Sequence, residues 1–325
     1  MRKAAREIIL TLIISALSFC VISCSGEGGK EYGDKTDISL IFSSDLRGKI
    51  RSCGCSVKDM GGLGRMASYV KEVRSSGGNT VYITGGDNFS SDFSFSREMA
   101  ELVMDSYELM GLDIYTPGEY EFIFGLDYLR EISSAYSFDI VIANLLDRAG
   151  GELIFEPAYV VREMDTGLKI AVTGVLDETI VFPGYVDQSG FVLEPAAEAL
   201  ERIIPGMREE ADLLFLVCHM EKQRAEELLG RVKDFDVAIL AHNKPKMDRL
   251  MRVGETVLLG AGGQGKYMGR LNYLIGRGGE MEQASVKLVP LTDDLAIDPG
   301  VRQLFEGYGI ELTDKAEQKK NKSYR

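Results

Sequence analysis

Five short polar segments, each directly after a run of apolar residues, most constrain the fold of this 325-residue chain. A loop that follows a strand places its polar side chains at the rim of the sheet, where α/β folds build their sites. The segments occupy residues 44–47, 86–88, 118–121, 218–219 and 241–244. Their carboxylate, carboxamide and imidazole groups are typical of a two-metal hydrolase centre. Arg47 and Lys244 are exceptions, because neither is a usual metal ligand.

From residue 37 onward, short β-like runs alternate with stretches of helical periodicity, which indicates an α/β architecture. Strands are expected at 38–43, 80–84, 139–143, 168–175, 213–217 and 237–240, and helices at 63–74, 97–110, 195–208 and 224–233. Further strands at 256–260, 269–275 and 284–290 follow without helices between them. This order predicts a four-layer fold, in which a two-sheet β sandwich is flanked by helices. One domain is expected over 37–290, followed by a C-terminal helix and a polar tail over 291–325.

The N-terminus has the features of an export signal. Three basic residues precede an apolar run at 8–23, which is short for crossing a bilayer core of about 30 Å. The run ends in Val-Ile-Ser-Cys, which resembles a bacterial lipobox with Cys24 as the lipidated residue. We therefore expect a signal peptide over 1–23, a flexible tether over 24–36, and a protein anchored by lipid in the bacterial cell envelope. An uncleaved membrane anchor is the alternative.

Charge and cysteine content limit the classes of partner and cofactor that this chain is expected to bind. The formal net charge of −13 argues against nucleic acid, whose phosphates this chain would repel. Beyond the leader only Cys53, Cys55 and Cys218 remain, so we expect neither a dense disulfide framework nor a haem attachment sequence. The Cys53–Gly–Cys55 segment is able to bind a soft metal, form a local disulfide or pair with another protein. Inert thiols are the alternative.

A series of motifs resembles the 5′-nucleotidase/UDP-sugar hydrolase family of the calcineurin-like metallophosphoesterase superfamily. The matching segments are Asp-Leu-Arg-Gly at 45–48, Gly-Gly-Leu-Gly-Arg at 61–65, Gly-Asp-Asn-Phe at 86–89, Gly-Glu-Tyr-Glu-Phe at 118–122, Cys-His at 218–219 and Ala-His-Asn-Lys at 241–244. Their order and approximate spacing hold over almost the whole expected domain. The resemblance implies a metallo-dependent phosphatase-like fold.

The resemblance also implies where a metal ion would bind. The family's second metal site corresponds to Asp87, Glu119, His219 and His242, in which Glu119 replaces a carboxamide. Carboxylates and imidazoles suit Mn, Zn or Fe, so at most one divalent ion is expected at this position. The alternative is that the two histidines are hydrogen-bonded groups without a metal.

The family's first metal site is altered in this sequence. It corresponds to Asp45, Asp87 and two imidazoles, for which this chain has Arg47 and Lys244. An arginine has no lone pair to offer a metal, so at most one ion per chain is expected, with Asp45 as a further candidate ligand. We expect Arg47 and Lys244 to form ion pairs with the two aspartates. The alternative is that both cations point to solvent.

Three functions follow from these replacements. The family's catalytic histidine corresponds to Tyr120, which carries no positive charge at neutral pH, whereas Arg47 and Lys244 are able to bind phosphate. We therefore expect weak or no hydrolysis of a phosphorylated small molecule. A non-catalytic protein of the cell envelope that binds another protein, without a cofactor, is the first alternative. A metal or redox role of Cys53 and Cys55 is the second.

We do not expect nucleotide specificity to be carried over from the family. Its base-binding domain lies C-terminal to the catalytic domain, and only about 35 residues follow residue 290 in this sequence.

Overall fold

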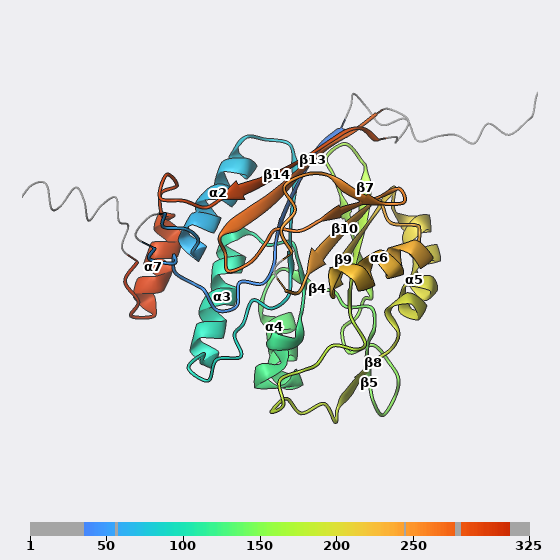
Figure 1. The fold of residues 1–325 in the computed structure, drawn as a ribbon, viewed down its shortest axis with the longest axis horizontal. Helices are drawn as coiled ribbons and strands as arrows, with labels where there is room; N and C mark the ends of the chain where they lie inside the picture. The colour runs from blue at the N-terminus through green and yellow to red at the C-terminus, as the bar shows by residue number, and fades with distance from the viewer. Residues whose placement is uncertain (1–35, 56–57, 244, 277–280, 313–325) are drawn as a thin grey trace, which may run out of the picture.

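The computed structural model describes residues 36–55, 58–243, 245–276 and 281–312. The expected signal peptide and tether, Cys24, Lys244 and the last 13 residues of the expected tail lie outside this part of the chain. Two six-stranded sheets form the centre of the protein and helices cover their outer faces (Figure 1). The predicted mixed α/β fold with two sheets is confirmed.

The first sheet is built around parallel strands from the N-terminal half. Its order is β14 (Met281–Pro290), β13 (Tyr267–Ile275), β1 (Thr36–Ser43), β2 (Asn79–Gly85), β3 (Ile114–Thr116) and β4 (Asp139–Ile140). Strands β1 to β4 are parallel, whereas β13 and β14 form an antiparallel hairpin beside β1. The helices on its outer face are α2 (Leu63–Ser75), α3 (Arg97–Met110), α4 (Leu126–Ala135) and α7 (Pro299–Gly307).

The second sheet comes mainly from the C-terminal half. Its order is β11 (Met251–Val253), β12 (Thr256–Leu259), β10 (Val237–Ala241), β9 (Leu213–His219), β7 (Lys169–Leu176) and β6 (Tyr159–Glu163). Helices α5 (Ala196–Glu210) and α6 (Lys222–Arg231) cover its outer face (Figure 1). Strands β5 (Leu145–Asp147) and β8 (Phe191–Leu193) form a separate two-stranded sheet.

Alternation along the strands builds the layers. In β9, Phe215 and Val217 pack into the core between the two sheets, whereas Leu214, Leu216 and Cys218 pack toward α5 and α6. A strand places successive side chains on opposite faces, so a nearly continuous apolar run is what a strand buried on both faces requires.

The two sheets approach closely where β2 and β10 end. A Cβ atom on Gly85 would lie only 2.5 Å from the Cβ of Ala241, and one on Gly118 would lie 2.3 Å from Cε1 of His219. Larger side chains at these glycines would clash with the facing loops. The small residues therefore allow the loops of both sheets to converge.

Several elements differ from the sequence-based expectation. The strand expected at 139–143 is too long: β4 ends at Ile140, because the chain then crosses to the second sheet, where the Ala143 N–H donates to Gly174 O (2.8 Å). The short β3, helix α4 and the edge strand β6 were not predicted. Beyond residue 290, Val301 and Phe305 of α7 are fully buried in the same core as α2 and α3. Among the described residues, no helix combines the length and apolar character needed to cross a bilayer.

Candidate metal site

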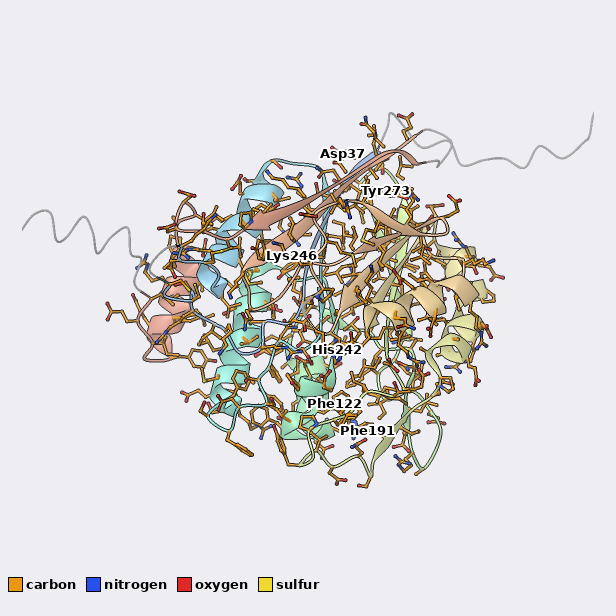
Figure 2. The ribbon with its side chains drawn as sticks, in the orientation of Figure 1. Asp37, Phe122, Phe191, His242, Lys246 and Tyr273 are labelled. Atoms are coloured by element: carbon orange, nitrogen blue, oxygen red, sulfur yellow. The ribbon has the colours of Figure 1, made fainter. Side chains whose placement is uncertain are left out.

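The predicted site residues come together at the carboxyl ends of strands from both sheets. Asp45 follows β1, Asp87 follows β2, and Glu119 opens the 3₁₀ helix η1 (Glu119–Phe124) after β3. His219 is the last residue of β9, and His242 follows β10. Figure 2 shows His242 near the middle of the molecule, between the parts built on the two sheets.

Four of these side chains form a compact cluster. Asp87, Glu119, His219 and His242 each offer one ligand atom, and these atoms lie within 4.8 Å of one another. The Nε2 of His219 is 2.7 Å from Glu119 Oε2 and 3.5 Å from Asp87 Oδ1. The Nδ1 of His242 is 3.4 Å from Glu119 Oε1. Only His242 is partly exposed, so the cluster opens to solvent on that side.

The loops hold these groups in an unusual backbone conformation. Asp45, Arg47, Asp87, His242 and Asn243 all have positive φ angles, between 51° and 75°. Such angles cost side-chain-bearing residues on the order of 1 kcal/mol each, and they gather at functional sites. The Arg47 N–H donates to Asp87 O (2.8 Å) and the Asp45 N–H to Gly86 O (3.0 Å), which fixes the first two loops against each other.

Glu121 organises the loops after β2 and β3, a role that the sequence did not reveal. Its fully buried carboxylate accepts N–H bonds from Gly118 (2.6 Å), Asp87 (2.8 Å) and Asn88 (2.7 Å). It also accepts from Phe89 N (3.2 Å) and from the Tyr115 hydroxyl (2.7 Å). The only signal was a second glutamate in the Gly-Glu-Tyr-Glu segment, which does not distinguish a positioning carboxylate from a ligand.

Arg47 forms the predicted ion pairs with both aspartates. Its Nη2 lies 3.0 Å from Asp87 Oδ2 and 3.4 Å from Asp45 Oδ1. Its guanidinium carbon also lies 5.1 Å from the centre of the Tyr120 ring, within cation–π range. The Tyr120 N–H donates to Asp87 Oδ1 (3.3 Å). Arg47 therefore places a fixed positive charge beside the cluster, whereas Lys244 lies outside the described residues.

Burial and neighbouring charges shift the pKa values of three groups in the cluster. Burial disfavours a charged imidazole at His219, but the charges of Asp87 and Glu119 outweigh it and raise the pKa of His219 to about 9. Burial raises the pKa of Asp87 to about 8. Burial also opposes ionisation of Glu119, but its hydrogen bond with His219 and the nearby imidazole of His242 lower its pKa well below the ordinary range. A divalent cation would replace the protons on these groups, because it favours ionised carboxylates and neutral imidazoles.

The donor set fits a divalent metal ion. Two carboxylates and two imidazoles are usual ligands for Mn, Zn or Fe. In addition, Nδ1 of His242 lies 3.4 Å from Glu119 Oε1 and has no hydrogen-bond partner among the described residues, so this ring nitrogen is available to an ion in the cluster.

We expect replacement of Arg47 by alanine to lower the free energy of unfolding of the metal-free protein by about 2 kcal/mol. Removing one partner of a buried ion pair strands the other charge, and the 21% exposure of Arg47 moderates that loss. Urea denaturation in the presence of a chelator measures the effect. Arg47→Lys keeps the charge and is expected to lose less. Equal losses in both variants would show that the charge has no part in stability.

An exposed aromatic pair was not predicted. Phe93 is 94% exposed and Tyr185 is 50% exposed, and their ring centres lie 5.7 Å apart. The hydroxyl of Tyr185 donates to Ser91 O (3.3 Å), which holds the ring in place.

The cysteines separate into two environments. Cys218 is fully buried between the second sheet and its helices, and burial raises its pKa to about 12. Cys53 and Cys55 are exposed on the loop that precedes α2. A reactive thiol needs access and thiolate character, so Cys218 lacks both requirements.

The chain is similar in sequence to bacterial phosphoesterases, although no family model matches it. The 5′-nucleotidase of Vibrio parahaemolyticus is 24% identical over 322 residues, covering 88% of this chain and 57% of the relative. Protein UshA of Escherichia coli is 27% identical over 255 residues, covering 68% of this chain and 46% of the relative. The chain thus spans about half the length of these curated relatives.

Solved structures share its fold. The sulfate thiohydrolase SoxB of Thermus thermophilus superposes with a TM-score of 0.75 at 18% identity, covering 84% of this chain and 60% of that one. The calcineurin-like phosphoesterase YfkN of Bacillus subtilis has a TM-score of 0.70 at 18% identity, covering 84% of this chain and 96% of that one. The expected metallo-dependent phosphatase-like fold is confirmed.

Proposed function

Because the chain belongs to the 5′-nucleotidase family of calcineurin-like metallophosphoesterases, we propose that it binds a phosphorylated small molecule beside a single divalent cation. Asp87, Glu119, His219 and His242 hold the ion, which is Mn, Zn or Fe. The observation that carries the proposal is the position of Arg47, whose guanidinium pairs with Asp45 and Asp87. A second cation there would meet a fixed positive charge at the same two carboxylates.

The residues around the ion are better suited to binding than to rapid hydrolysis. A guanidinium donates N–H groups to phosphoryl oxygens, and Arg47 is already oriented by two aspartates and by Tyr120. When bound, the ion supplies Lewis-acid stabilisation of phosphoryl charge. Tyr120 offers a neutral hydrogen-bond donor but no positive charge. We therefore propose that phosphoester hydrolysis is slow or absent and that the site mainly binds its phosphorylated ligand without cleaving it.

The proposal includes a place in the cell envelope. The basic residues, the apolar run at 8–23 and the lipobox-like segment support export and attachment through lipid on Cys24. The protein would then bind its phosphorylated ligand outside the cytoplasm.

Metal content tests the proposed site. The soluble form, residues 25–325, is expected to retain about one ion per chain after supplementation with Mn, Zn and Fe, as measured by inductively coupled plasma mass spectrometry. His242→Ala is expected to lose the ion, because it removes one of four donors. Glu152→Gln, an exposed carboxylate in the loop after β5, is the matched control and is expected to retain it. No ion under any supplementation, or two ions in the unaltered chain, would contradict the proposal.

A further inference from the structure

The Cys53–Gly54–Cys55 segment presents two thiols on a fixed part of the surface. Gly54 has a φ of +68°, the Cys55 thiol donates to the Cys53 carbonyl oxygen (3.9 Å), and the Cys53 thiol donates to the Lys58 carbonyl oxygen (3.7 Å). Asp59 anchors the turn, because its Oδ1 accepts the Gly54 N–H (2.8 Å) while its Oδ2 pairs with the buried Arg65 (3.1 Å). The two thiols are therefore exposed and close together, on a turn that Asp59 fixes to the protein.

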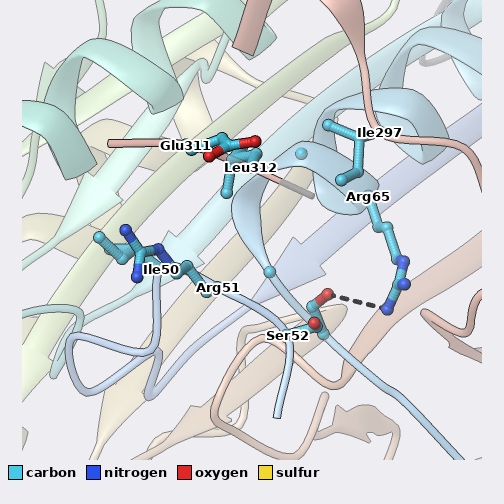
Figure 3. Close-up of a pocket in the computed structure, with 10 residues that line it drawn as sticks. Ile50, Arg51, Ser52, Arg65, Ile297, Glu311 and Leu312 are labelled. Carbon is cyan, nitrogen blue, oxygen red and sulfur yellow. Dashed lines mark hydrogen bonds between the residues drawn. The ribbon is translucent and has the colours of Figure 1, made fainter. Parts of the chain in front are cut away.

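A basic pocket lies directly beside these thiols. It has a volume of about 330 Å³ and is lined by Lys49, Arg51, Ser52, Cys53, Gln264 and Lys266. No described carboxylate lies within ion-pair distance of Lys49, Arg51 or Lys266. Arg51 and Ser52 also line the neighbouring cavity of about 170 Å³ drawn in Figure 3, to which Glu311 contributes from the C-terminal segment.

Three cations that form no ion pair with a described carboxylate gather in this one pocket, which is a local exception in a chain with a net charge of −13. Their field attracts anions and repels free metal ions, so it disfavours a soft-metal site at the two thiols. The same field favours a substrate that is anionic and also reacts with thiols. A disulfide that carries carboxylates meets both conditions.

We propose that Cys53 and Cys55 form a dithiol–disulfide exchange site whose substrate is a small anionic disulfide, recognised by Lys49, Arg51 and Lys266. The Cys53 thiolate attacks one sulfur of the substrate, the substrate S–S bond breaks, and the leaving thiolate takes up a proton. The Cys55 thiolate then attacks Cys53 in the mixed disulfide and releases the second thiol. The substrate gains two electrons and two protons, and the protein retains a Cys53–Cys55 disulfide.

The surroundings distinguish the two sulfur atoms. Slight burial opposes ionisation of Cys53, but hydrogen bonds from the Cys55 thiol and the Met60 backbone lower the pKa of Cys53. The hydrogen bond to Cys53 raises the pKa of Cys55. Cys53 is therefore the attacking thiol, and Cys55 resolves the mixed disulfide.

Two small disulfides of opposite charge test the proposal on the full chain. The reduced protein is mixed with oxidised glutathione, which is anionic, or with cystamine, which is cationic. Rates of loss of the two thiols are measured by alkylation and peptide mass spectrometry. Each rate is divided by the rate at which the same disulfide reacts with the neutral thiol 2-mercaptoethanol. At low ionic strength we expect oxidised glutathione to react about 10-fold faster, and this preference to shrink at about 0.5 M salt. The net charge of the whole chain predicts the opposite preference, so only the local pocket explains this result.

Variants assign the effect to the pocket. Arg51→Glu/Lys266→Glu is expected to abolish or reverse the preference, whereas the matched reversal Lys222→Glu, on the exposed face of α6, is expected to leave it unchanged. Cys55→Ser is expected to stop at a mixed disulfide on Cys53. Equal normalised rates for both probes, faster reaction with cystamine, or two stable mixed disulfides in place of a Cys53–Cys55 link would each overturn the proposal. The metal content of these variants is a separate measurement, so this result does not depend on the proposed ion.

Discussion

Replacing Glu121 with alanine is expected to lower the free energy of unfolding by about 4 kcal/mol, a large effect for one residue. The side chain is fully buried and accepts five hydrogen bonds, four of them from backbone N–H groups of the loops after β2 and β3. Each buried donor left without an acceptor costs about 1–3 kcal/mol, and rearrangement of the loops recovers part of the sum. Urea denaturation monitored by circular dichroism measures the change.

The matched control is Glu152→Ala, which removes an exposed carboxylate and is expected to change stability by less than about 0.5 kcal/mol. Glu121→Gln keeps the shape of the side chain but places an amide N–H₂ against donors, so we expect an intermediate loss. A loss below about 1 kcal/mol in Glu121→Ala would show that the loops do not depend on this carboxylate.

The double variant Arg47→His/Lys244→His is expected to bind about two divalent ions per chain where the unaltered protein binds about one. The change removes the cations and supplies one imidazole at residue 47, beside Asp45 and Asp87, and a second at residue 244, which the family resemblance assigns to the first metal site. Adding Tyr120→His is expected to raise the hydrolysis rate of a simple phosphoester by about 100-fold or more, because a second ion and a cationic donor each stabilise the transition state.

Metal analysis and a phosphatase assay on the same preparations measure both effects. Arg47→Lys/Lys244→Arg, which keeps both positive charges, is the matched control and is expected to bind no second ion. A count that stays at one ion in the histidine variant, with the fold intact, would show that the replaced residues are not what limits the metal number.

The four residues of the cluster were predicted from the sequence, but the carboxylate that positions their loops was not. Asp87, Glu119, His219 and His242 were expected at one rim because each follows an apolar run and matches a family motif. The strands that precede them are parallel neighbours within each sheet, so their carboxyl ends meet at one edge. That they hold an ion stays a prediction. The role of Glu121 was not accessible, because three of its five partners are backbone groups of a loop 32 to 34 residues away in the sequence.

Strand length explains most of the missed elements. With three residues, β3 is too short to show a periodic pattern, and the edge strand β6 carries the polar residues Arg162 and Glu163. Helix α4 follows the irregular turn η1 and was overlooked for that reason. Long, strongly patterned elements such as α3 were predicted with their observed ends.

Because Gly85 approaches Ala241 closely, the proposed ion would link the two sheets of the molecule. Asp87 and Glu119 extend from one sheet, and His219 and His242 extend from the other. Any ion that binds all four would oppose separation of the sheets, and at a concentration 100 times its dissociation constant it would add about 2.7 kcal/mol to the stability of the protein. A methyl group at residue 85 would meet Ala241 and push the two sheets apart, and the two pairs of donors would move apart with them.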